Sequence, residues 1–491
     1  MASMKCSLIS TWSNDHVIQL PEFRSRGVKA TTRSSFSVLC RKSDNPMHLE
    51  EEKSTISIGS NNNESNKRLR ILVAGGGIRG LVLALAAKHR GFDVEVFEKA
   101  DSTALRGEGR HRGSIQLSSS ALAVLKAIDE DAAKKIMEEV CCVIGNKVNG
   151  FADGVSRAWL TKFDLSTPAM EKGLPITRVV CRMTLQDTLA NAVGPHILKN
   201  KSKVADFIQE PNKVKVILED GQQYEGDILV GADDIWPRVR SKMFGKQEAS
   251  YSNFTCYSGL TEIAPDHIPE TTSTVGYQAF LGCNQYFVLC DVGEGRMQWY
   301  AFIKEPPLTT LIKGNKKKRL LDVFGNWCDR VIAAISITEE EMIIERGIYD
   351  RDMIYKSWGI GRVTLLGDAA HPMQPNLGLG GCMAIEDCYH LILELGRVSE
   401  NGFNVHMSDE IISALRRYEK KRMFRVGILH EVSRTASKML SQYHSYIEFK
   451  VGPLSTVLST LQITHPAIPV ARAIMQLFSA PFMDWAITGH G

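Results

Sequence analysis

The chain has 491 residues, of which 44% are apolar and 23% are charged, an ordinary balance for a globular protein. Its formal net charge is only +4, and no basic stripe alternates with aromatic residues, so we expect no nucleic-acid partner. The eleven cysteines form no Cys-x-x-Cys pair and no cysteine–histidine set with zinc spacing, so no metal site is predicted.

Residues 1–66 differ in composition from the rest of the chain. The segment begins Met1-Ala2-Ser3, is rich in serine and threonine, and carries more basic than acidic residues as far as Lys42. After Met47 it becomes acidic and then rich in asparagine and serine. This pattern is typical of a plastid or mitochondrial transit peptide followed by a disordered linker. The alternative is a disordered tail that carries no targeting signal.

A Gly-x-Gly-x-x-Gly turn, formed by Gly75, Gly77 and Gly80, follows directly after the first apolar strand. The expected elements are a strand over 71–74, a helix over 81–88 and a second strand over 93–98. That second strand ends in Glu98, about 20 residues beyond the glycines, as in dinucleotide-binding folds. The helix N-terminus would receive the diphosphate and Glu98 the ribose hydroxyls. The turn alone does not distinguish NAD from FAD.

Two later segments repeat the pattern of a buried strand that ends in an acidic residue. The first runs over 227–232 into Asp233, and the second runs over 361–366 into Gly367 and Asp368. The second is followed by another glycine-rich turn, 375–381, and by a helix expected over 382–395. Such a set of three separated turns is expected to converge around one dinucleotide.

With these segments in order, the chain resembles the FAD-dependent monooxygenases of the p-hydroxybenzoate hydroxylase type. The resemblance extends from about Arg68 to about Trp485. Within that family, four interleaved segments resemble those of the zeaxanthin epoxidases of plant chloroplasts. These segments are 106–113, 181–186, 297–302, and 373–376 together with 380–387.

The resemblance implies a cofactor, FAD, and a role for individual residues around it. Asp368 would hydrogen-bond the ribityl chain, Arg182 would reach the cofactor from a helix, and Asp233 would bridge the diphosphate and a nicotinamide donor. The glycines of 378–381 would lie beside the isoalloxazine ring, at a helix N-terminus. The full set assigned to the cofactor is Gly75, Gly77, Gly80, Glu98, Arg112, Arg182, Asp233, Gly367, Asp368, Pro375, Gly378, Gly380 and Gly381.

The implied reaction needs no catalytic side chain, because the flavin carries the chemistry. Reduced flavin would react with O2 at C4a, and the hydroperoxide would epoxidise the ring double bonds of zeaxanthin through antheraxanthin to violaxanthin, in carotenoid and abscisic acid biosynthesis. NADPH, directly or through ferredoxin, would supply electrons. We expect Phe287, Trp299 and Phe302 to contact this apolar substrate. Two alternatives remain open: a related hydroxylase with another apolar or aromatic substrate, and a catalytically impaired flavin-binding homologue.

We therefore predict an α/β fold: a Rossmann-like FAD-binding domain, an interleaved β-sheet substrate domain and C-terminal helices. The predicted parts are 1–66 (transit peptide and linker), 67–396 (monooxygenase domain) and 397–491 (helical region). Within the monooxygenase domain, the flavin-binding pieces are 68–149, 177–244 and 361–396, and the substrate sheet is 150–176 and 250–350. The stretch 447–487 is expected to hold short helices that pack on the core or dock on a plastid membrane surface, consistent with a location peripheral to the thylakoid or envelope membrane.

Four residues depart from the epoxidase pattern. Arg79 and Asp234 stand where glycine is usual. A positive φ at Asp234 is expected to reduce the stability of the folded protein by about 1 kcal/mol. Pro237 replaces a helix-capping serine. Leu379 replaces a glutamine expected near the flavin ring, so Leu379→Gln is expected to improve coupling. Full-length epoxidases also carry a C-terminal forkhead-associated domain, which has no counterpart in the printed sequence.

Overall fold

The computed structural model of the protein describes most of the chain after residue 67. The described residues are 68–100, 113–143, 147–262, 275–293, 295–307, 315–400, 407–440, 442–444, 465 and 467–489. They all lie within one compact unit, Lys67–His490. The predicted transit peptide and linker in 1–66, and the predicted site residue Arg112, lie outside the described residues.

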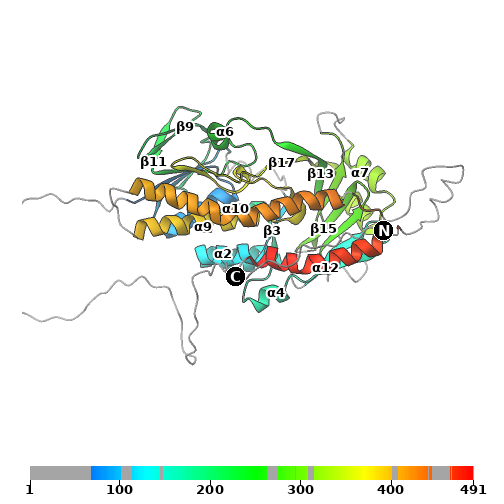
Figure 1. Cartoon of the computed structure of the whole chain (residues 1–491). Helices are drawn as coiled ribbons and strands as arrows, with labels where there is room; N and C mark the ends of the chain where they lie inside the picture. The colour runs from blue at the N-terminus through cyan, green and yellow to red at the C-terminus, as the bar shows by residue number, and fades with distance from the viewer. Residues whose placement is uncertain are drawn as a thin grey trace, which may run out of the picture. The chain divides into compact units, whose positions relative to one another are not determined.

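A five-stranded parallel sheet forms the centre of the nucleotide-binding part (Figure 1). Its strands, in spatial order, are β18 (Val363–Leu365), β12 (Ile228–Gly231), β1 (Arg70–Ala74), β2 (Asp93–Phe97) and β8 (Leu198–Lys199). The strand–turn–helix unit predicted around the glycines is present, with α1 spanning Ile78–His89. The predicted α/β fold class is confirmed.

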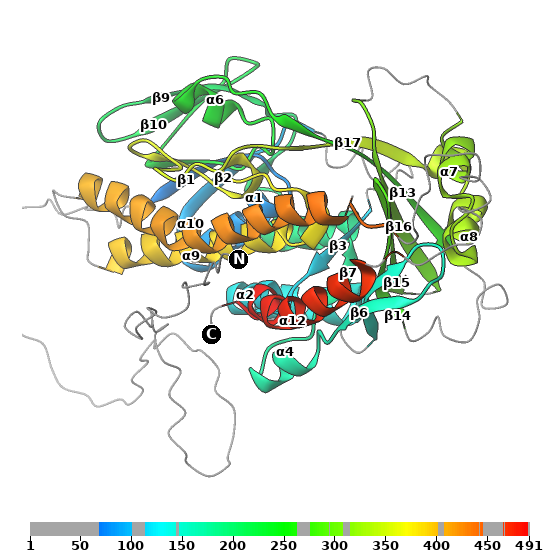
Figure 2. The ribbon, with the colours of Figure 1, turned by 45° about the vertical axis from the view of Figure 1, so that its right-hand side comes forward.

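Helices pack against this sheet and bury its apolar strands. The helices around it are α1, α5 (Arg182–Val193), α9 (Gly380–Glu400) and α10 (Met407–Leu440). Figures 1 and 2 both show α9 and α10 running side by side. Leu72, Leu83 and Ile385 are fully buried in the shared core. The parallel strands are apolar on both faces because both faces are covered. Helices such as α1 pack on the sheet, and the small sheet that contains β10 (Val214–Leu218) and β11 (Gln223–Gly226) also packs on β1 and β12.

Two small antiparallel sheets border the parallel sheet. One has the order β11 (Gln223–Gly226), β10 (Val214–Leu218), β9 (Val204–Gln209), followed by α6 (Arg238–Phe244). The other has the order β3 (Ser114–Leu117), β7 (Arg178–Cys181), β4 (Cys141–Val143), beside α2 (Ser119–Ile128) and α3 (Glu130–Lys135).

A seven-stranded sheet forms the expected second part of the fold. Its order is β17 (Ile344–Asp350), β13 (Ser250–Glu262), β16 (Arg296–Lys304), β15 (Gln285–Gly293), β14 (Val275–Gly282), β5 (Val148–Asp153), β6 (Trp159–Phe163). The ranges predicted as sheet also contain helices: α4 (Thr167–Glu171), α7 (Lys316–Phe324) and α8 (Asp329–Ile337). Figure 2 shows α7 and α8 along the outer face of this sheet.

The described end of the stretch 447–487 differs from the expected series of short helices, whereas residues 447–464 and 466 lie outside the described residues. Residues 467–488 form one helix, α12, with Pro481 in its interior. Its end packs into the fold, where Ala486 and Ile487 are buried. Within the part of the chain that the structure describes, no helix combines the length and the apolar character that a membrane span requires.

Candidate active site

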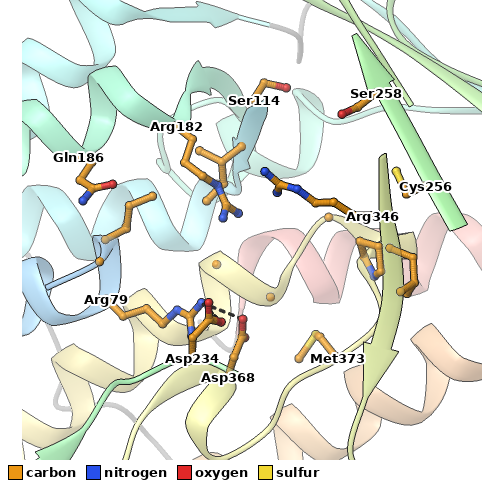
Figure 3. Close-up of a pocket in the computed structure, with 18 of the residues that line it drawn as sticks. Arg79, Ser114, Arg182, Gln186, Asp234, Cys256, Ser258, Arg346, Asp368 and Met373 are labelled. Carbon is orange, nitrogen blue, oxygen red and sulfur yellow. Dashed lines mark hydrogen bonds and ion pairs between the residues drawn. The ribbon is translucent and has the colours of Figure 1, made fainter. Parts of the chain in front are cut away.

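A cavity of about 1270 Å³ lies where the glycine turn, the two acidic turns and the seven-stranded sheet meet (Figure 3). Gly77, Glu98 and Asp368 border it together, although they come from three separate segments of the sequence. The volume exceeds the roughly 300–1,000 Å³ of most small-molecule sites. The cavity is therefore large enough for a dinucleotide and a second molecule beside it.

The three glycines of the first turn have different spatial roles. Gly75 has φ +116°, and a Cβ there would lie 2.4 Å from the carbonyl oxygen of Ala232. A Cβ on Gly80 would lie 1.9 Å from the carbonyl oxygen of Gly75, so helix α1 can approach the turn only without a side chain there. A Cβ on Gly77 would meet no atom within 4 Å, because that residue faces the open cavity.

Glu98 holds the glycine turn in place as well as bordering the cavity. Its carboxylate accepts hydrogen bonds from the backbone N–H groups of Gly76 (2.7 Å) and Ala100 (2.8 Å). A carboxylate offers about four lone-pair positions, so acceptor capacity remains for ligand hydroxyls. The sequence pattern predicted only the ligand-facing role.

Asp233 caps helix α6, which the sequence did not predict. Its Oδ2 accepts hydrogen bonds from the N–H groups of Arg238 (2.6 Å) and Val239 (3.2 Å). The cap expected to be lost through Pro237 is therefore supplied from four residues upstream. The other oxygen, Oδ1, is buried and has no partner among the described residues. Burial raises the pKa of Asp233 to about 6, against the opposing effect of the two backbone donors.

Arg79 forms ion pairs with both acidic turns at the floor of the cavity (Figure 3). Its Nη2 donates to Asp368 Oδ2 at 2.7 Å and to Asp234 Oδ1 at 3.2 Å. Asp234 has φ +70°, so the left-handed conformation anticipated for a glycine position is present. In the sequence, Asp234 lies 155 residues after Arg79, and Asp368 lies 289 residues after it.

Most of the other predicted cofactor residues also lie around the cavity. Arg182, at the start of α5, extends into it, and Pro375, Gly378, Gly380 and Gly381 line it at the N-terminus of α9. Gly367 does not line the cavity. It lies beneath the Arg79 side chain, whose Cδ would be 2.5 Å from a Cβ at that position.

Two of the three residues predicted to contact the substrate lie away from this cavity. Phe287 and Trp299 are fully buried in the core between the seven-stranded sheet and helices α7 and α8. Phe302 lines the cavity as expected. Side chains alternate between the two faces of a strand. On β15 and β16 the even-numbered residues face the cavity, and the odd-numbered residues face helices α7 and α8. The cavity-facing set on β15 and β16 is Tyr286, Val288, Cys290, Tyr300 and Phe302.

Leu379 is also placed differently from the expectation. Its side chain is 1% exposed and packs in the main core, whereas the flanking Gly378 and Gly380 line the cavity. We expect Leu379→Gln to lower the free energy of unfolding by about 1–3 kcal/mol, because it buries an amide without a partner. Urea unfolding measures this loss, and Leu379→Met, of similar volume, is the control. Improved coupling in the glutamine variant with unchanged stability would contradict this placement.

A buried polar network beneath the second acidic turn was not predicted from the sequence. Asp387 on α9 accepts hydrogen bonds from His371 Nε2 (2.6 Å), Arg422 Nε (2.7 Å) and the N–H of Gly367 (3.2 Å). Arg422 also pairs with Glu386 at 2.9 Å. The network therefore ties α9 and α10 to the turn that carries Asp368.

This arrangement of a Rossmann-type sheet, a dinucleotide turn and a second sheet over the cavity defines a class of flavoprotein. A family model described as "FAD binding domain" matches residues 68–404, and the chain belongs to that family. The fold is also similar to that of HpxO from Klebsiella pneumoniae, solved with FAD and uric acid. The TM-score is 0.68 at 22% identity, over 85% of this chain and 96% of that one.

The curated relatives have a more specific name. The chain is 51% identical over 424 residues to "Zeaxanthin epoxidase, chloroplastic" of Oryza sativa subsp. japonica, covering 86% of this chain and 63% of that protein. It is 45% identical to the protein of the same name from Capsicum annuum, covering 100% of this chain and 74% of that one. The predicted resemblance to zeaxanthin epoxidases is confirmed. The chain spans less than two thirds of the length of the rice protein.

Proposed function

We propose that the protein holds FAD in this cavity and epoxidises the ring double bonds of zeaxanthin. The observation that carries the proposal is the continuity of the cavity, which joins the dinucleotide turn at Gly77 and Glu98 to the apolar face of the sheet at Val288 and Phe302. A flavin bound along the turns would have its ring end beside a wall suited to an apolar polyene. The relatives named zeaxanthin epoxidase support this choice of substrate.

The residues of the chain would bind and orient both molecules. The N-terminus of α1 and the open face of Gly77 would receive the diphosphate, and Glu98 would accept hydrogen bonds from the adenosine ribose. The N-terminus of α9, at Gly380, would direct its positive end toward the flavin ring. Reduced FAD supplies the activation of O2 and the transfer of one oxygen atom to the alkene. The protein would exclude water and place the double bond.

The proposal extends to the electron donor and the location. NADPH, directly or through ferredoxin, would reduce the flavin. Because the fingerprint that ends in Glu98 occurs once in the sequence, the donor would act without a dinucleotide-binding domain of its own. The name "chloroplastic" of the relatives, with the composition of 1–66, supports a chloroplast location. Association with the surface of the thylakoid or envelope membrane would bring the enzyme to its lipid-soluble substrate.

Spectroscopy and product analysis test this function. The purified protein reconstituted with FAD should be yellow, bleach on reduction and recover its colour in air. With reduced ferredoxin and zeaxanthin in lipid micelles, the product should gain one oxygen atom per ring. A protein that binds FAD and leaves zeaxanthin unchanged would contradict the assigned substrate, and a protein that cannot take up FAD would contradict the whole proposal.

The alternation of side chains in the sheet gives a matched pair of substitutions. Phe302 stacks on Tyr286 with ring centroids 4.3 Å apart and lines the cavity, so Phe302→Ala should raise the KM for zeaxanthin about tenfold. Phe287→Ala should lower stability by about 3–5 kcal/mol and leave KM unchanged, because its ring lies in the core. Steady-state kinetics and urea unfolding measure the two effects. A larger KM effect at position 287 than at position 302 would contradict the assigned cavity face.

A further inference from the structure

Two of the residues that depart from the family pattern contact each other. The family resemblance implies glycine at positions 79 and 234, and here the Arg79 guanidinium donates to the Asp234 carboxylate at 3.2 Å. The same nitrogen donates to Asp368 at 2.7 Å, the residue proposed for the ribityl chain. The two replacements therefore add one positive and one negative charge at the same place in the cavity floor.

The surroundings hold the arginine in this position. Gly367 leaves the space in which the aliphatic part of Arg79 lies, since a Cβ there would be 2.5 Å from Arg79 Cδ. The Arg79 side chain is 18% exposed, while Asp234 and Asp368 are more open to the cavity, at 63% and 28%. Burial would lower the pKa of Arg79, but Asp368 and Asp234 raise it above its ordinary value, so the guanidinium stays charged.

One donor of the arginine remains unused. Arg79 Nη1 is buried and has no partner among the described residues. Arg182 extends into the same cavity (Figure 3), and its pKa is lowered first by desolvation and then by repulsion from Arg79. An anion placed between the two guanidinium groups would satisfy the free donor and relieve this repulsion.

Without Arg79, the acidic groups would face an incoming diphosphate directly. Asp234 and Asp368 would then present two carboxylates, while Arg182, whose pKa both carboxylates raise, would be a guanidinium beside them. Like charges at short range in a partly desolvated site disfavour binding. The family resemblance implies glycine at both positions, a combination that carries neither the Asp234 carboxylate nor the Arg79 charge.

We propose that Arg79 and Asp234 form a charge-paired unit that adapts the cofactor site, in which Arg79 is the counter-ion that allows Asp234 and Asp368 to face the diphosphate of FAD. Arg79 is thus a further cofactor-positioning residue, and Asp234 is the replacement that makes it necessary. This inference rests on the proposed binding of FAD in the cavity.

A double-mutant cycle on the full-length protein tests the unit. The dissociation constant of FAD is measured by quenching of flavin fluorescence for the wild type, Arg79→Gly, Asp234→Gly and the double variant. Arg79→Gly should weaken binding about tenfold or more, a change of about 1.4 kcal/mol or more. The double variant should return to within about threefold of the wild type, because the uncompensated carboxylate has been removed. The defect of Arg79→Gly should shrink at high salt, where repulsion is screened.

Two further variants serve as controls for the effect of the Arg79 charge on FAD binding. Arg79→Gln keeps a hydrogen-bond donor of similar reach without the charge, and it should weaken FAD binding in the same direction even if the glycine variant folds poorly. Lys126→Met removes a positive charge from an exposed ion pair with Glu130 on α2, away from the cavity lining, and should leave the dissociation constant unchanged.

The outcomes separate this inference from the proposed function. A wild type that does not bind FAD overturns both. A wild type that binds FAD, with Arg79→Gly and Arg79→Gln binding as tightly or more tightly, overturns the charge-paired unit alone. A double variant as weak as Arg79→Gly would also overturn it, because the defect would then not arise from Asp234.

Discussion

The substitution Gly80→Ala is expected to lower the free energy of unfolding by about 3 kcal/mol and to abolish FAD binding. A Cβ at Gly80 would lie 1.9 Å from the carbonyl oxygen of Gly75 and 3.1 Å from its carbonyl carbon, both of which are backbone atoms that no rotamer change can move. Relief requires α1 to withdraw from the turn, and α1 is buried along residues 80–87. Overpacking of this kind costs about 1–3 kcal/mol, and a clash with backbone belongs at the upper end.

Gly77→Ala is the matched control in the same turn. Gly77 has φ −69°, which alanine adopts without strain, and a Cβ there would extend into open space. We therefore expect unchanged stability and weaker FAD binding, because the methyl group occupies the surface that the diphosphate would approach. Urea unfolding of the apoprotein and fluorescence titration with FAD measure the two properties separately. Equal stability losses in the two variants would contradict the different roles assigned to these glycines.

The parts of the site that were predictable from sequence are those with a local signature. The turn at Gly75, Gly77 and Gly80 has fixed spacing, and its neighbouring strands and helix lie within 30 residues. The acidic turns at Asp233 and Asp368 carry their own strand-then-acid pattern. Parallel strands bring their carboxyl ends to one edge of a sheet, so their convergence around a single cavity follows from the fold.

The substrate wall was less predictable because strands β15 and β16 are apolar on both faces. One face packs against α7 and α8 and the other faces the cavity, so Trp299 and Phe302 are equally suitable as core residues and as wall residues. Alternation separates the two sets, but only the structure shows which set faces the cavity. Leu379 illustrates the same limit: its neighbours Gly378 and Gly380 line the cavity, while its own side chain enters the core.

Contacts between distant segments were not predictable at all. The ion pairs of Arg79 join residues that no short pattern relates. The sequence marked Arg79 and Asp234 as separate departures, and their compensating charges became evident only from their contact in the structure.

Removal of the Asp387 carboxylate is expected to have an equally large effect on stability. The side chains of His371, Asp387 and Arg422 are 0%, 0% and 2% exposed, so water cannot replace the lost partner. Loss of one member of a buried ion pair costs about 3–5 kcal/mol, and we expect this loss for Asp387→Ala. Asp387→Asn keeps the shape and still accepts a hydrogen bond from Arg422, so its loss should be about 1.5–3 kcal/mol.

The pH dependence of this loss identifies the charge as its cause. Burial alone would raise the pKa of Asp387, but His371 and Arg422 lower it to about 2. The ordinary pKa of an aspartate is about 3.9, so the stabilising effect of the charge is fully present above about pH 5 and is lost as the pH falls toward 2. The difference in unfolding free energy between the wild type and Asp387→Ala should therefore be constant from pH 7 to about pH 5 and narrow below pH 4. Urea unfolding across this range measures the difference. The difference in unfolding free energy could instead stay constant down to the lowest pH at which the wild type folds. That result would show that packing, rather than the buried charge, anchors the turn beneath Asp368.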